Sequence, residues 1–263
     1  IHQHLDLIAG LPYEDYDSFH RSFNDVYALR PQQLQLGFLK VLKGSHMKEM
    51  TEEYGIVYKE QEPYEVLGTK WLPYEDILRL KMVESMVELY YNSGQFQNTI
   101  ACVEPLFEDA FTLYERLGQF YEKKGYSEIS HSRMRRYEIL LEFVKEELEE
   151  QESKKLADDQ KLKAENSAET AKEDNRNVDT VTWEKVADSM IYDLYLRENL
   201  KSHPSFEMDQ KPYEKAVWEY RRLEKVPKTA HIEVFRDGRI LMFDYENRDP
   251  LLHNAAVKKI QLW

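Results

Sequence analysis

Three residues of types that bind metal ions alternate at the start of the chain: His2, His4 and Asp6. The surrounding run is apolar and reads as a strand, and alternate residues of a strand share one face. A metal site is therefore the first chemistry to consider. Ligands at every second residue of a flat strand spread over about 13 Å, which is too far for one ion. We expect no metal ligands among these residues.

The single thiol of the chain, Cys102, is the next candidate. One cysteine cannot form an internal disulfide, and alone it cannot hold a zinc ion or an iron–sulfur cluster. It lies between Ala101 and Val103 with no histidine nearby in the sequence, so we interpret it as a core thiol and not as a nucleophile. The use of only one cysteine indicates a reducing, cytoplasmic compartment.

Other polar and aromatic groups are interpreted as structural. His131 and the basic run that follows it are typical of a solvated helix face. Asp188 and Asp193 read as surface residues, so we expect no catalytic acid pair in the last segment. The neighbours Tyr90 and Tyr91 are expected to pack in the core and not to stack on a substrate.

Charge and hydropathy exclude several classes of function. The formal net charge of the 263-residue chain is -13, which argues against a nucleic-acid or anionic-membrane surface. No apolar run approaches the roughly 20 residues that span a bilayer, and the first residues lack the basic leader of a signal peptide. The chain opens directly in a strand-like run, which we interpret as a cut through a longer protein.

The elements that must position these residues begin with a βαβ unit. We expect a strand up to Gly10, a helix over residues 15–29 and a second strand over residues 34–42. A helix between two strands implies a parallel, right-handed crossover. Because two parallel strands make no stable sheet alone, the rest of this sheet is expected outside the chain.

The remainder of the chain is expected to be mostly helical. The spacing of apolar residues predicts helices over residues 45–54, 75–91, 99–125, 130–150, 182–200 and 213–223, and an extended stretch over residues 56–67. Asp237-Gly238 between two β-rich runs predicts a hairpin over residues 231–245. The fold class is thus mainly α, a helical domain with a partial βαβ unit at the N-terminus and a small β-hairpin near the C-terminus.

The motif at residues 6–14, DLIAGLPYE, resembles the fifth barrel strand of radical S-adenosylmethionine (SAM) enzymes, which often reads DLIxGLPGE. Residues 34–45 resemble the sixth strand and its closing turn. Short matches at 64–67, 80–84 and 91–94 resemble the extension of cobalamin-dependent members, the group related to the anaerobic magnesium-protoporphyrin IX monomethyl ester oxidative cyclase. The resemblance covers about the first 45 residues as barrel and most of the remainder as extension.

The resemblance and the distribution of charge along the chain together indicate four parts. Residues 1–45 are the C-terminal βαβ remnant of a radical SAM barrel, and residues 46–151 are a helical extension. The charged stretch 152–177 is a flexible linker, a frayed helix that leads into disorder, because it has too few apolar residues to bury. Residues 178–263 are a helical segment with the β-hairpin.

The resemblance also implies a cofactor-binding role for Asp6, Ile8, Gly10 and Lys40. Asp6 would accept hydrogen bonds from polar groups of SAM, while Ile8, Gly10 and Lys40 would lie near the adenine. The alternatives stay open: a carboxylate that caps local backbone, an ordinary buried strand residue, a turn glycine and an exposed lysine.

Two departures from the pattern limit this role. Tyr13 replaces the usual glycine, and the C-x3-C-x2-C loop that holds the [4Fe–4S] cluster is absent from the sequence. We therefore expect no catalytic residues, no metal ligands and no cofactor in this chain alone. SAM, the [4Fe–4S] cluster and cobalamin are expected in the parent enzyme.

The resulting hypothesis is a C-terminal accessory or substrate-side portion of a cobalamin-dependent radical SAM enzyme, oxidative cyclase-like or methyltransferase-like and inactive alone. The alternative is a non-catalytic helical protein-interaction module. Expected partners are the N-terminal remainder of the same protein, an unknown small-molecule substrate and a second copy of the chain through exposed strands. No nucleic-acid partner is expected.

Overall fold

The computed structural model describes residues 3–165 and 180–262. The chain forms two compact units, each built from two separate stretches of the sequence. Unit 1 contains Ile1–Gly94 and Phe107–Ser130, and unit 2 contains Gln95–Leu106 and His131–Trp263. These two units follow from how the chain packs and do not test the four-part division expected from the sequence. That division stays a prediction.

Unit 1 opens with the predicted βαβ unit. It consists of β1 (His4–Ala9), α1 (Tyr16–Ala28) and β2 (Gln33–Phe38), and the two strands pair in parallel. The side chain of Asp15 accepts a hydrogen bond from the Ser18 backbone, and the Ser18 side chain accepts one from the Asp15 backbone. This capping box fixes where α1 begins. The parallel crossover is confirmed, and β2 ends four residues earlier than expected.

The rest of unit 1 is a hairpin and a set of helices. Its elements are α2 (His46–Glu49), β3 (Val57–Tyr58), β4 (Val66–Gly68), α3 (Tyr74–Val87), a π-helical turn η1 (Glu88–Asn92) and α5 (Ala110–Lys123). α3 and α5 pack on each other with Gly118 at the closest approach, where a Cβ atom would lie 3.0 Å from Met82. The helix predicted over residues 45–54 is much shorter than expected.

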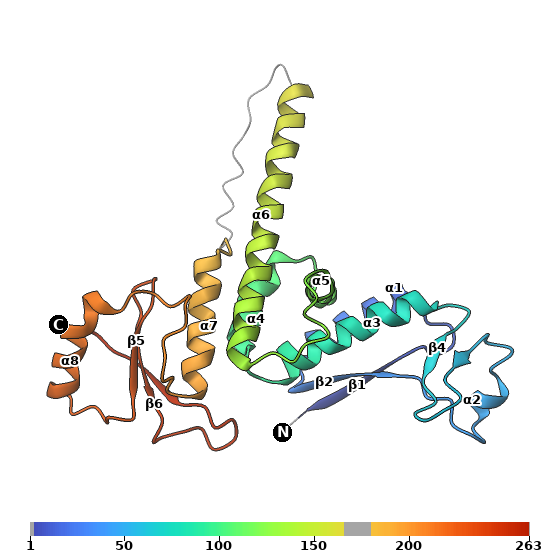
Figure 1. The fold of residues 1–263 in the computed structure, drawn as a ribbon, viewed down its shortest axis with the longest axis horizontal. Coiled ribbons are helices and arrows are strands. Elements are labelled where there is room, and N and C mark those ends of the chain that lie inside the picture. The colour runs from blue at the N-terminus through green and yellow to red at the C-terminus, as the bar shows by residue number, and fades with distance from the viewer. Residues whose placement is uncertain (1–2, 166–179, 263) are drawn as a thin grey trace. The chain divides into compact units, whose positions relative to one another are not determined.

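Helices cover only one face of the β1–β2 pair, as the ribbon of unit 1 shows (Figure 1). Along β1, exposed residues alternate with more buried ones up to Ala9, and on β2 Leu34 and Leu36 are buried. The opposite face, which carries Asp6 and Ile8, is open to solvent. In most proteins both faces of a parallel sheet are covered, so this open face is unusual.

Unit 2 is built on three longer helices and a small sheet. Its elements are α4 (Gln97–Val103), a 3₁₀ turn η2 (Glu104–Leu106), α6 (Arg133–Glu165), α7 (Trp183–Arg197), a second 3₁₀ turn η3 (Lys211–Tyr213), α8 (Glu214–Leu223), β5 (His231–Val234), β6 (Ile240–Asp244) and β7 (Ala256–Lys259). The linker expected over residues 152–177 overlaps α6 as far as Glu165. Residues 166–177 lie outside the described part.

The C-terminal hairpin is confirmed. β5 and β6 pair antiparallel, and Gly238 adopts a φ of 82° at the turn between them. A left-handed backbone favours glycine, which explains why Asp237-Gly238 marks the turn. β7 adds a third antiparallel strand beside β6 that the sequence pattern did not predict.

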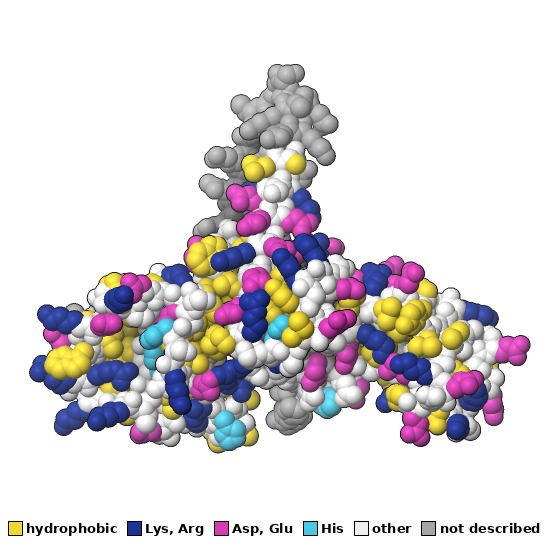
Figure 2. Space-filling view, in the orientation of Figure 1, with side chains coloured by type: hydrophobic (Ala, Val, Ile, Leu, Met, Phe, Trp, Pro, Cys, Tyr) yellow, Lys and Arg dark blue, Asp and Glu magenta, His cyan; other side chains and the backbone are white. Residues whose placement is uncertain are grey.

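The predicted class, mainly α with small β elements, is confirmed. Among the described residues, none of the helices combines the length and the apolar character needed to cross a membrane. On the face seen in Figure 2, acidic and basic side chains are interspersed, including along α6.

Candidate functional site

Two of the four residues expected to bind a cofactor share the open face of β1. The side chain of Asp6 is 62% exposed, and Ile8 is 47% exposed. His4 lies on the same face, with its Nε2 atom 3.2 Å from an Asp6 carboxylate oxygen. Asp6 therefore has a local partner and still offers its carboxylate to solvent.

The other two residues lie beyond the strand ends. Gly10 is buried with a φ of 86°, and a Cβ atom there would lie 2.8 Å from Cγ1 of Val66. Lys40 is exposed and forms an antiparallel bridge with Glu65. The structure thus brings Asp6 and Ile8 onto one face, whereas Gly10 lies against Val66 of β4 and Lys40 pairs with Glu65 just before it. The cofactor-binding role of all four stays a prediction.

The structure shows the backbone conformation and the neighbours of Tyr13, the residue that departs from the radical SAM pattern. Its φ is 67°, a left-handed conformation that suits the glycine of the radical SAM pattern. The Tyr13 side chain is 72% exposed, and its ring centroid lies 4.6 Å from that of Trp71. Contact with an aromatic neighbour offsets part of the backbone strain.

The remaining sequence interpretations can be placed as well. Tyr90 is fully buried and its hydroxyl lies 2.6 Å from that of Tyr121, so its role in core packing is confirmed. Cys102 is a half-buried free thiol on α4. Arg135, which is half-buried on α6, forms ion pairs with Glu138 and Glu142.

The expectation that Asp188 and Asp193 are surface residues is wrong. Asp193 is 3% exposed and Asp188 is 7% exposed. The two carboxylates of α7 are buried because each binds a distant segment, which a reading of helical periodicity alone cannot reveal. Asp193 accepts four hydrogen bonds of 2.7–3.2 Å, two each from Asn98 and Thr99, at the start of α4.

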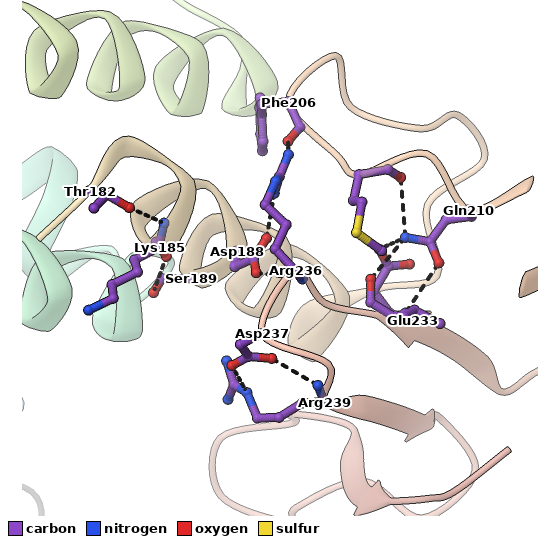
Figure 3. A network of polar contacts seen from close by, with 12 residues as sticks. Thr182, Lys185, Asp188, Ser189, Phe206, Gln210, Glu233, Arg236, Asp237 and Arg239 are labelled. Carbon is purple, nitrogen blue, oxygen red and sulfur yellow. Dashed lines mark hydrogen bonds and ion pairs between the residues drawn. The ribbon is translucent and has the colours of Figure 1, made fainter. Parts of the chain in front are cut away.

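Asp188 belongs to a polar network that ties α7 to the hairpin (Figure 3). Its carboxylate accepts a 2.9 Å hydrogen bond from the Arg236 backbone and an ion pair from the Arg236 guanidinium. The same guanidinium donates to the carbonyl of Phe206 at 2.7 Å. Gln210 bridges the loop to β5, because its Nε2 atom lies 2.8 Å from Oε1 of Glu233 and 3.0 Å from the carbonyl of Val234. The network fixes the loop after α7 against the sheet.

Next to this network, unit 2 contains a pair of acidic side chains, Glu207 and Glu233, that the sequence analysis did not identify. Glu207, His231 and Glu233 place one potential ligand atom each within 4.8 Å of one another. The expectation that the last segment holds no catalytic acid pair stays a prediction, because proximity does not establish a catalytic role. His231 and Glu233 alternate on β5 and so share a face, which was a readable signal. Glu207 comes from a loop, and no local pattern places it beside them.

Burial shifts the protonation of this group. Burial, followed by the negative charge of Glu207, raises the pKa of Glu233 well above its ordinary range. Burial also lowers the pKa of His231 to about 3, with the charges of Arg221 and His203 acting in the same direction. At neutral pH the imidazole is therefore neutral, and the raised pKa of Glu233 favours the protonated form of that carboxyl group.

Comparison with known proteins gives one family. The model of a family described as protein of unknown function (DUF4080) matches residues 52–237, which is more than half of the chain. The matched range contains Glu207, His231 and Glu233 but not β1 or β2. No curated protein matches the chain.

Proposed function

The chain belongs to the DUF4080 family, and we propose that it is the C-terminal, substrate-side portion of a cobalamin-dependent radical SAM enzyme. In this proposal β1 and β2 complete a barrel whose other strands come from the N-terminal remainder of the protein. The reaction of the parent is oxidative cyclase-like or methyltransferase-like, on an unknown small-molecule substrate.

The open face of the β1–β2 pair is the observation that carries the proposal. Parallel strands normally need cover on both faces and neighbours at their edges. Within the described residues, β1 and β2 pair only with each other as strands, and Ile8 is half exposed on the open face. Further strands and the interior of a barrel would cover this face.

The family and the turn after β1 support the same proposal. The DUF4080 family is associated with cobalamin and radical SAM proteins. The left-handed backbone at Tyr13 is the conformation that the glycine of the DLIxGLPGE pattern would favour. The turn at residues 10–14 therefore agrees with the resemblance in backbone conformation as well as in sequence.

The open face has side chains that fit part of a SAM molecule. The Asp6 carboxylate can accept hydrogen bonds from polar groups of the ligand, and Ile8 can contact a flat ring. Gly10 allows close approach of the backbone to Val66, so its contribution would be to shape the strand end. Lys40 would act from the end of β2.

This chain alone does not have the residues to hold the [4Fe–4S] cluster. A [4Fe–4S] cluster that binds SAM needs three thiolates, whereas this chain has one cysteine, on α4 in unit 2. We therefore derive no reaction step for the chain by itself, and we expect it to be inactive and to contain neither an iron–sulfur cluster nor cobalamin when purified.

Sequencing of the coding region before Ile1 tests the proposal directly. A C-x3-C-x2-C motif within roughly 200 residues, a distance compatible with one barrel, supports it. If the open reading frame contains no such motif, the proposal is wrong and the helical protein-interaction module is the better account.

A further inference from the structure

Unit 2 contains a small group of mixed nitrogen and oxygen donors that is separate from β1 and β2. The side chains of Glu207 and Glu233 are only 4% and 2% exposed, and that of His231 is 16% exposed. His203, whose side chain is 72% exposed, lies on the solvent side of the group and pairs with Glu207 at 2.6 Å. The three inner residues are thus enclosed but lie close to the surface.

The two carboxylates of this group need either a proton or a cation to balance them. Among the described residues, the ion pairs of Glu207 and Glu233 are made with histidines only. The nearby Arg236 guanidinium donates instead to Asp188 and to the carbonyl of Phe206. Two carboxylates removed from water at short range are strongly unfavourable unless a positive charge or a proton balances them.

Two of the three inner atoms are spaced nearly as ligands of one ion would be, and the third lies within 4.8 Å of both. Nε2 of His231 lies 3.0 Å from Oε2 of Glu233. Two ligands bound to zinc at 2.0–2.1 Å in a tetrahedral arrangement are about 3.3 Å apart. A shift of a few tenths of an ångström therefore converts this contact into a pair of adjacent metal ligands.

Outer groups already orient the candidate ligands. The Tyr195 hydroxyl donates to Oε1 of Glu207 at 2.8 Å, and Gln210 donates to Oε1 of Glu233 at 2.8 Å. The ring of Tyr195 also stacks on the His231 imidazole, with centroids 3.7 Å apart. Such hydrogen bonds and packing fix ligand orientation in metal sites. In both carboxylates the second oxygen, Oε2, is directed toward a histidine nitrogen.

We propose that Glu207, His231 and Glu233 form a binding site for one divalent transition-metal cation. One imidazole with two carboxylates suits zinc, iron or manganese, whereas magnesium and calcium prefer all-oxygen sites. Three protein ligands leave a further coordination position for water or another donor. The proposal is independent of the radical SAM assignment, and either can fail without the other.

Zinc binding by the full 263-residue chain is the test. The chain is treated with EDTA, desalted and titrated calorimetrically with ZnCl₂, and in parallel with CoCl₂, whose visible absorption reports the ligand geometry. We expect one equivalent to bind, with at least tenfold weaker binding in His231→Gln and in Glu233→Gln. The matched control is His46→Gln, which removes a histidine from an exposed His–Glu pair in unit 1 and should leave binding unchanged.

Each outcome decides the question. Absence of one-equivalent binding, equal affinity in His231→Gln and the unmodified chain, or equal affinity for MgCl₂ and ZnCl₂ overturns the proposal. Circular dichroism establishes that each variant is folded. If the two β5 variants do not fold, Glu207→Gln in the loop replaces them, and unchanged binding in that variant likewise refutes the site.

Discussion

Replacement of Asp193 by alanine should strongly destabilise unit 2. The carboxylate accepts hydrogen bonds from the backbone and side chain of both Asn98 and Thr99, and Thr99 is fully buried. Each buried donor left without a partner costs about 1–3 kcal/mol. Partial rearrangement of the hydroxyl and amide groups reduces the sum, so we expect a loss of about 3–5 kcal/mol in unfolding free energy, typical of a broken buried charge network.

Urea denaturation followed by circular dichroism measures this effect. With a slope of about 2 kcal/mol per molar urea, the unfolding midpoint of Asp193→Ala should fall by about 2 M. The control is Asp109→Ala, which removes the cap of α5 from a partly exposed position in unit 1 and should cost about 1 kcal/mol. A loss below about 1 kcal/mol for Asp193→Ala would show that its four hydrogen bonds do not support the contact between α4 and α7.

Three further predictions concern unit 1. Gly10→Ala should lose about 2–4 kcal/mol of stability, because it combines a positive φ with a 2.8 Å approach to Val66. Addition of Val66→Ala should restore about 1 kcal/mol. If the stability losses of the two single variants simply add in the double variant, the clash is refuted. Burial raises the pKa of Asp109, but hydrogen bonds from Thr112 and His20 together with the charge of His20 outweigh burial, and the net pKa is lowered. Since the folded state then favours the charged form, this stabilisation is present above the unfolded pKa of about 3.9 and is lost as the pH falls through the lower folded value. In Asp109→Asn, the unfolding free energy should therefore depend less on pH below pH 4. An unchanged pH dependence in that range contradicts this. Ile8→Glu should change stability by less than about 0.5 kcal/mol yet reduce self-association in sedimentation velocity, whereas a native chain that sediments as a 31.5 kDa monomer refutes association through the open face.

The elements set by local sequence were predictable. The βαβ unit follows from apolar periodicity with a capping box at Asp15, and the hairpin follows from Asp237-Gly238, whose glycine needs a left-handed backbone. β7 was missed because its residues are all exposed and carry no alternation of apolar and polar types. Its position depends on pairing with β6 and not on its own pattern.

Burial of charge was not predictable from the sequence. Asp193 finds its partners 94 and 95 residues away, and the segments that bring them together are adjacent only in the folded unit. Glu207 and Glu233 similarly meet through a loop and a strand. A helical face that contains aspartate reads as solvated unless the distant donors are known. The pair of Glu207 and Glu233 likewise becomes visible only in the fold, because no local pattern places Glu207 beside β5.

The central claim, that β1 and β2 belong to a radical SAM barrel, is tested most directly with the polypeptide encoded by the complete gene. The protein is purified anaerobically, reconstituted with iron and sulfide, and assayed for iron content and for reductive cleavage of SAM. We predict about four irons per chain, SAM cleavage, and at least tenfold weaker SAM binding in Asp6→Asn with unchanged iron content. A complete gene product that binds no cluster and leaves SAM intact would contradict the claim.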